Sequence, residues 1–246
     1  MFISTEYLII NYGVDEKIAR FFVDREPPVN NLYWHKKLLY LRPGVGYIFI
    51  PLIVDLLYKL GISRDLLLSD PFISTMEQTG HISALEETKQ IDSLTAIQKC
   101  ADLVKDNCKD QVWYNDIMSY FVDEDKYINK MASPFKALHR GDMFLFSICA
   151  LELNDRIKEK IVEQWFALIT TLLLLDDADD AKEDMKTGEE NAFIEKGMTI
   201  ENIEMATQLV AKNVDTISTL NKTMARDLHR QYKAMIQKPL ALLNTK

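Results

Sequence analysis

The sequence predicts an all-α protein in which residues 1–246 form one domain, a single large helical bundle. Apolar residues recur at the three- and four-residue spacing of amphipathic helices. The chain has only eight glycines and seven prolines, and it lacks the Asn-Gly and Asp-Gly pairs that join strands in hairpins. Its 48% apolar and 27% charged residues are typical of a globular protein with a substantial core.

Helix breakers divide the first part of the chain. Pro27 and Pro43 interrupt the helical pattern, and Gly61 is suited to the C-terminal end of a buried helix. In the stretch 62–90, Pro71, Gly80 and scattered Ser and Thr residues favour short helices and loops. The helices expected before that stretch cover residues 15–23, 32–41 and 48–60.

The pattern is more regular in the second part. Asp92 or Ser93 can cap the first helix there, Gly188 ends the longest one, and Pro239 disturbs the last. The motif Thr199-Ile-Glu-Asn predicts the start of that last, long helix near Glu201. The other expected helices cover residues 92–108, 111–121, 125–138, 142–153 and 155–185.

Six carboxylates fall among the nine residues 176–184, directly after the apolar run Leu172–Leu175. On a helix, Asp176, Asp180 and Asp184 lie one turn apart on one face, with Asp177 and Glu183 beside them. Like charges at this spacing repel, and a divalent cation would turn that repulsion into binding. Mg²⁺ favours a few carboxylates together with phosphate oxygens and water.

We therefore expect Mg²⁺ as the cofactor. A solvated acidic helix end is the alternative, although carboxylates near a helix C-terminus oppose the helix dipole at a cost of about 0.3–1 kcal/mol.

Two motifs in this segment resemble those of a known superfamily. Asp176-Asp177-x-x-Asp180, followed by Asp184, resembles the second aspartate-rich motif of trans-prenyltransferases. Displaced by one turn, Asp180-x-x-Glu183-Asp184 is similar to the second motif of squalene and phytoene synthases. Both groups belong to the isoprenoid (terpenoid) synthase superfamily. Upstream, the run His139–Phe144 lies where prenyltransferases carry Lys-Thr-Gly-x-Leu, so the resemblance covers roughly residues 130–225.

The resemblance implies a helical bundle of the terpenoid synthase type with a central cavity. It also implies an Mg²⁺-dependent enzyme that processes an isoprenyl diphosphate by prenyl transfer, head-to-head coupling or cyclisation. Arg140 and Lys186 would contact the diphosphate. The metal ligands would be Asp176, Asp177, Asp180, Glu183 and Asp184.

The opposing first aspartate-rich motif is the part of the pattern that this chain does not match. At the usual family separation, only Asp55 corresponds to it, in an otherwise apolar run. Asp102 and Asp106 resemble the first motif of the head-to-head enzymes but lie too close to Asp180 in the sequence. The alternative function is therefore a catalytically silent helical relative that binds a prenyl lipid or a partner subunit. An unrelated helical interaction protein is a third hypothesis.

Charge and cysteine content restrict the partners and the compartment. The net charge of −8 argues against a nucleic-acid groove. The most apolar stretch, residues 47–60, contains Pro51, Asp55 and Lys59, so we expect no membrane span. Three cysteines without zinc spacing, and an N-terminus unlike a signal peptide, predict reduced thiols and a cytoplasmic protein. The family resemblance adds a homodimer to the expected assemblies.

Overall fold

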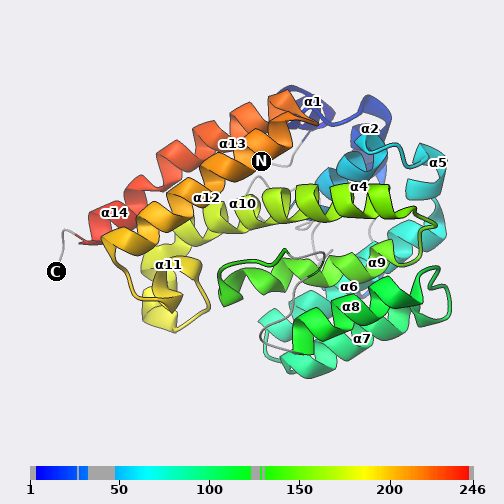
Figure 1. Ribbon diagram of the computed structural model, residues 1–246, viewed down its shortest axis with the longest axis horizontal. Coiled ribbons are helices and arrows are strands. Elements are labelled where there is room, and N and C mark those ends of the chain that lie inside the picture. Colours follow the sequence, from blue (N-terminus) through cyan, green and yellow to red (C-terminus); the bar gives the residue numbers. More distant parts are fainter. Residues whose placement is uncertain (1–3, 27, 33–47, 123–127, 129–130, 244–246) are drawn as a thin grey trace.

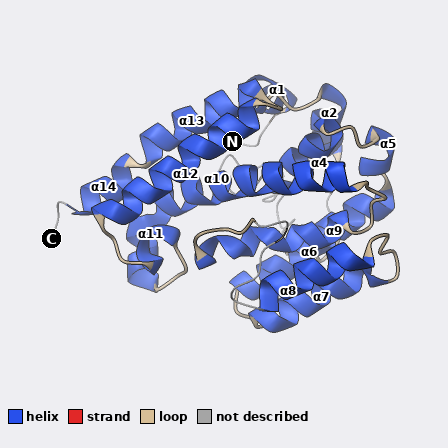
Figure 2. Cartoon of the chain, viewed as in Figure 1, coloured by secondary structure: helices blue, strands red, loops and turns tan. Residues whose placement is uncertain are grey.

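The regular elements of the protein are helices, as the sequence predicts (Figures 1 and 2). The computed structural model describes residues 4–26, 28–32, 48–122, 128 and 131–243. Within these residues there is no strand, and the only β pairing is an isolated bridge between Ile128 and Met131. The elements are α1 (Thr5–Tyr12), α2 (Glu16–Asp24), α4 (Phe49–Lys59), α5 (Arg64–Leu67), α6 (Asp70–Glu87), α7 (Ser93–Lys105), α8 (Gln111–Val122), the 3₁₀ helix η2 (Lys136–Phe144), α9 (Leu145–Ile148), α10 (Asp155–Thr187), α11 (Ala192–Glu195), α12 (Ile200–Ser218), α13 (Lys222–Met235) and α14 (Gln237–Leu243).

Helix α10, with 33 residues, runs through the middle of the molecule (Figure 1). It packs against α12, α13 and α14 on one side and against η2, α4 and α11 on the others. Helices α6, α7, α8 and α9 form a group below it in the view of Figure 1. The termini of α10 follow from the sequence, because the Asn154 side chain accepts the Ile157 N–H and Gly188 ends the helix in a left-handed conformation.

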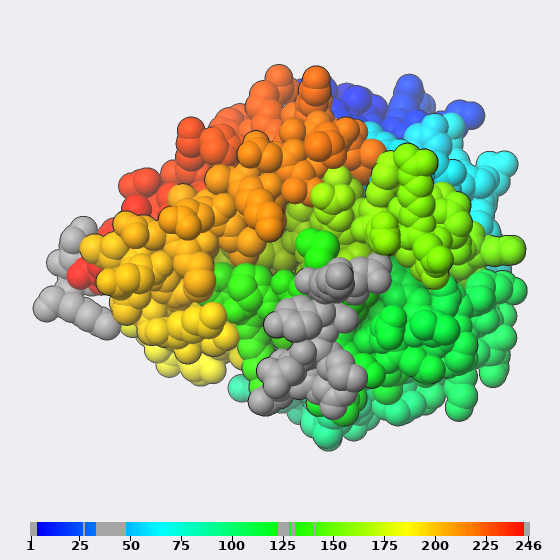
Figure 3. Space-filling view, viewed as in Figure 1, coloured from blue at the N-terminus to red at the C-terminus, as the bar shows by residue number. Residues whose placement is uncertain are grey.

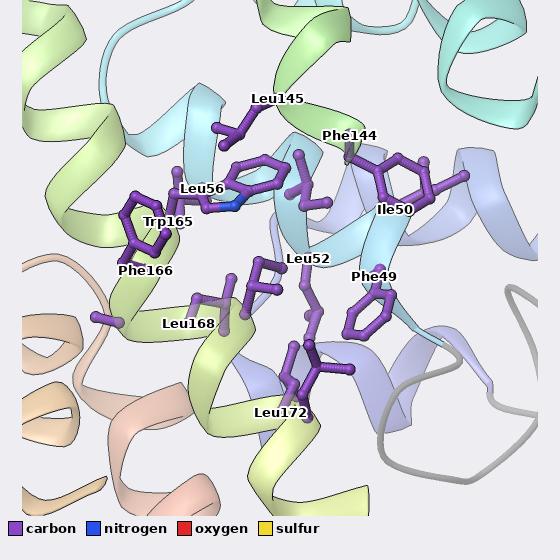
Figure 4. Close-up of a cluster of buried hydrophobic side chains, with 14 of the residues drawn as sticks. Phe49, Ile50, Leu52, Leu56, Phe144, Leu145, Trp165, Phe166, Leu168 and Leu172 are labelled. Carbon is purple, nitrogen blue, oxygen red and sulfur yellow. The ribbon is translucent and has the colours of Figure 1, made fainter. Parts of the chain in front are cut away.

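The central stretch of α10 is buried on every face. All residues from Gln164 to Leu175 are buried, which is the pattern of a helix surrounded by others. Figure 4 shows Trp165 and Leu168 from this stretch in a cluster with Leu52 of α4. The hollow described beside this cluster, between α4, α10 and α13, has a volume of about 10 Å³ and is lined in part by Leu168 and Met224. That volume is about the size of one water molecule.

Several expected helices are confirmed, namely those over residues 15–23, 48–60, 92–108, 111–121 and 155–185. The expected helix over 32–41 lies outside the described residues. Three other expectations were wrong. Residues 70–87 form one long helix, α6, because Pro71 sits in its first turn, where a missing N–H costs nothing.

The expected final helix is in fact three helices. The chain leaves helical geometry after α12, and the Asn221 side chain caps α13 by accepting the Met224 N–H.

The expected helices over 125–138 and 142–153 are also replaced. Where the structure describes this region, η2 covers residues 136–144 and only α9 is α-helical before α10.

The N-terminal helix is tied to the C-terminal part of the chain. The Asn221 side chain donates from Nδ2 to the Tyr12 carbonyl at 2.8 Å. Gly13, which follows Tyr12, has a φ of +59°, and a Cβ there would lie 2.8 Å from Asn221 Oδ1. Both the backbone conformation and the close approach therefore require glycine.

No helix in the described part of the chain is both long enough and apolar enough to cross a bilayer.

Candidate functional site

The acidic segment, residues 176–184, forms the last turns of α10 and carries its carboxylates on two different faces. Asp177 and Asp184 are only 2% and 8% exposed and point toward the interior, whereas Asp180 and Glu183 are exposed. Asp176 is half-buried between the two sets. The segment continues into α11, which lies at one end of the molecule and is drawn in yellow in Figure 3. The five predicted ligands thus lie on one helix but do not share one face.

The two buried carboxylates hold the turn that follows α10. Asp177 Oδ2 accepts the Ala192 N–H at 2.7 Å. Asn191 donates from Nδ2 to Asp184 Oδ2 at 2.8 Å and to the Asp177 carbonyl at 2.7 Å. The same Asn191 accepts the Phe193 N–H and so caps α11. Asp177 and Asp184 therefore act as anchors for the α10–α11 connection, which we call the Asn191 clasp.

The outer face of the acidic segment is crowded with negative charge. Asp179 forms an ion pair with Lys238 of α14. Partial burial raises the pKa of Asp180, and the carboxylates of Asp179, Asp184 and Glu183 raise it further, against a lowering effect of Lys238. Within the described residues, no group of three or more His, Cys, Asp or Glu side chains has an arrangement that could hold a metal ion.

Of the two predicted diphosphate contacts, the structure describes the side chain of Lys186 only. Lys186 is exposed in the last turn of α10. Arg140 falls within η2, but its side chain lies outside the described part of the structure. The next residue, Gly141, must be a glycine, because a Cβ at this position would lie 2.6 Å from Ile169 Cγ2 and 3.1 Å from Leu173 Cδ1. The glycine therefore lets η2 approach α10 closely.

Asp55, the predicted remnant of a first motif, is fully buried on α4, and its carboxylate binds neighbouring groups of the protein. It forms an ion pair with Lys59 and accepts the Asp15 N–H at 2.8 Å. Burial raises its pKa, and the Lys59 charge opposes that effect. It lines the same small hollow as Leu168. Leu168 and Asp176 are eight residues apart on α10, which corresponds to about 12 Å along the helix axis between this hollow and the start of the acidic segment.

Asp142 is a titratable group within the run His139–Phe144 for which the sequence predicted no role. It is 2% exposed and accepts hydrogen bonds from Tyr120 Oη at 2.7 Å and from Trp165 Nε1 at 3.0 Å. Burial raises its pKa to about 7, although both hydrogen bonds act in the opposite direction. The available signal was its position directly before the apolar run Met143–Phe146, because a carboxyl that is buried there needs partners.

Comparisons with known proteins give no indication of function, so function is inferred from the fold and from the geometry of this site. No protein-family model matches the chain, and no curated protein or solved structure is significantly similar to it.

Proposed function

We propose that the chain is a non-catalytic α-helical binding protein. The observation that carries this proposal is the Asn191 clasp, in which Asp177 and Asp184 already accept hydrogen bonds from the protein itself. A carboxylate committed to a buried backbone or amide donor would leave that donor unsatisfied if it turned to a metal, at a cost of roughly 1–3 kcal/mol. Two of the five predicted ligands thus have a structural role.

The interior supports the same proposal. Pockets that hold drug-sized ligands have volumes of roughly 300–1,000 Å³. The hollow beside Asp55 has about 10 Å³, which is too small for a prenyl chain, and the described hollows of about 610 and 690 Å³ are open to solvent. Among the two alternatives that the resemblance implies for a silent relative, this geometry favours a partner bound at the surface over a lipid held inside.

The chemistry of the surface points to a basic partner. The chain carries a net charge of −8, and the exposed Asp180, Glu183, Glu189 and Glu190 outnumber the exposed Lys182 and Lys186 at the α10–α11 end of the molecule. Charge of one sign on an accessible surface accelerates the association of an oppositely charged partner, and salt weakens the effect. The acidic segment would then anchor α11 with its inner carboxylates and attract the partner with its outer ones.

A lysine-rich peptide labelled with a fluorophore is a suitable probe of this proposal. We expect it to bind the wild-type protein at low salt and to bind Asp180→Asn/Glu183→Gln at least several-fold more weakly. The matched control is Glu159→Gln/Glu163→Gln, which neutralises two exposed carboxylates near the other end of α10. Equal weakening by both double variants would mean that only net charge matters, and the proposed surface would be abandoned.

The Mg²⁺-dependent enzyme of the isoprenoid synthase type is the second candidate, and one observation favours it. The raised pKa of Asp180 comes in part from three neighbouring carboxylates, a situation that a bound cation would relieve. Asp176, Asp180 and Glu183 would then be the ligands of Mg²⁺, and the metal would bind the isoprenyl diphosphate.

Calorimetry with Mg²⁺ and pyrophosphate separates the two candidates. The binding-protein proposal predicts no binding heat, and the same result for Asp176→Asn/Asp180→Asn. The enzyme candidate predicts a heat that this double variant loses and that Glu159→Gln/Glu163→Gln keeps. Release of pyrophosphate from farnesyl diphosphate by the wild type alone would establish the enzyme and refute the first proposal.

A further inference from the structure

The turn between α7 and α8 lies against the end of α9, and each of these segments carries a cysteine. Cys108 is in the turn and is half-exposed, whereas Cys149 directly follows α9 and is buried. Helices α7, α8 and α9 pack against one another in the lower group of Figure 1. Both cysteines are free thiols.

The backbone holds the two cysteines next to each other. The Lys109 N–H donates to the Cys149 carbonyl at 2.8 Å. With standard bond lengths, this hydrogen bond keeps the Cα atoms of Cys108 and Cys149 within about 7.6 Å. Disulfides have Cα separations of about 4.4–6.8 Å, so this bound places the two cysteines near the range in which a disulfide can form. The ion pair between Asp110 and Lys158 of α10 fixes the same turn.

The two thiols are also close enough to influence each other. Burial raises the pKa of the Cys149 thiol, and the nearby Cys108 thiol raises that pKa further. Both thiols also influence Tyr114, whose pKa is raised first by burial and then by Asp102, Cys108 and Cys149. The Tyr114 ring lies 5.9 Å from the Phe146 ring of α9, the helix that Cys149 follows.

We propose that Cys108 and Cys149 form a redox-sensitive pair that closes to an intramolecular disulfide when the protein meets a disulfide oxidant such as oxidised glutathione. The third cysteine does not belong to this site. Cys100 is fully buried on α7, and its sulfur contacts the Met143 thioether at 3.9 Å. The inference is independent of the proposed binding function.

The exposures of the two thiols set the order of the steps. Cys108, which solvent reaches, loses its proton to water, attacks one sulfur of oxidised glutathione and releases one glutathione thiolate. Cys149 then loses its proton, attacks the Cys108 sulfur of the mixed disulfide and releases the second glutathione thiolate. Two protein thiols are oxidised, one oxidised glutathione is reduced to two thiols, and the two protons end on those thiols. Because the pKa of Cys149 is raised, closure is expected to accelerate with increasing pH.

The test is oxidation of the folded protein, followed by alkylation in denaturant and peptide mass mapping. After treatment with oxidised glutathione, we expect two of the three thiols to resist alkylation and one linked peptide pair to contain Cys108 and Cys149. Dithiothreitol should restore all three. The oxidised form should also melt several degrees higher than the reduced form, because the closed loop restricts the unfolded chain.

Variants of each cysteine complete the experiment. Cys108→Ser changes a half-exposed residue and should abolish the linked pair, as should Cys149→Ser, whereas Cys100→Ala should retain it. If Cys149→Ser does not fold, as judged by circular dichroism, Cys108→Ser carries the comparison. A stable mixed disulfide on Cys108, a link to Cys100 or a link between two chains would each overturn the proposal.

Discussion

Replacing Asp142 by asparagine tests whether a buried carboxyl makes the stability of the protein depend on pH. The carboxyl accepts hydrogen bonds from Tyr120 Oη and Trp165 Nε1, neither of which carries a charge. An asparagine of the same shape can satisfy both partners. Its oxygen accepts from Trp165, and its amide nitrogen donates to the Tyr120 oxygen, which is both a donor and an acceptor.

The expected magnitude follows from the pKa of Asp142, which burial raises from 3.8 to about 7. Between these values the folded protein keeps a proton on Asp142 that the unfolded chain has lost. Stability from this group is therefore fully present below pH 3.8 and is lost as the pH rises through about 7. The slope inside the window is about 1.4 kcal/mol per pH unit, which gives roughly 4 kcal/mol in total.

The assay is urea unfolding of the wild type and Asp142→Asn at several pH values between 4 and 8. The free energy of unfolding of the variant minus that of the wild type should rise by about 1.4 kcal/mol per pH unit up to about pH 7 and then level off. Titration of every other group cancels in this difference. Asp116→Asn, an exposed change on the same helix as Tyr120, should give a flat difference. A flat difference for Asp142→Asn as well would refute the reasoning.

Two further substitutions test contacts around the acidic segment and η2. Gly141→Ala should lower the free energy of unfolding by about 1–3 kcal/mol, because its Cβ would overlap Ile169, and a loss below about 0.5 kcal/mol in urea unfolding would contradict this close approach. Asn191→Ala should cost about 1–3 kcal/mol, because Asp184 loses its buried partner. Hydrogen exchange should then be faster for the Ala192 amide than in the wild type, and unchanged exchange there would argue against the Asn191 clasp.

The long central helix could be predicted because its signals are local. Its apolar spacing, the Asn154 cap and Gly188 lie within one continuous stretch. The break before α13 could not be predicted in the same way. Residues 219–221 contain neither proline nor glycine, and the Asn221 side chain is committed to Tyr12, more than two hundred positions earlier in the chain. Such a contact leaves no periodic signal near the break.

For the candidate site, the sequence located the acidic segment on α10 but not the face of each carboxylate. The spacing of Asp176, Asp180 and Asp184 predicted one shared face. In the structure Asp184 turns inward with Asp177, because Asn191 and the backbone of Ala192 supply donors there. Those donors lie beyond the end of the helix, where helical periodicity carries no information.

The position of α10 has a consequence for how the chain is made. Its apolar stretch, residues 164–175, is covered by α4 from earlier in the sequence and by α12 and α13 from later. During synthesis this stretch leaves the ribosome before the later helices exist. A continuous apolar surface is therefore accessible to chaperones until α13 has been translated. Truncation before residue 222 would leave the side that α13 covers permanently exposed.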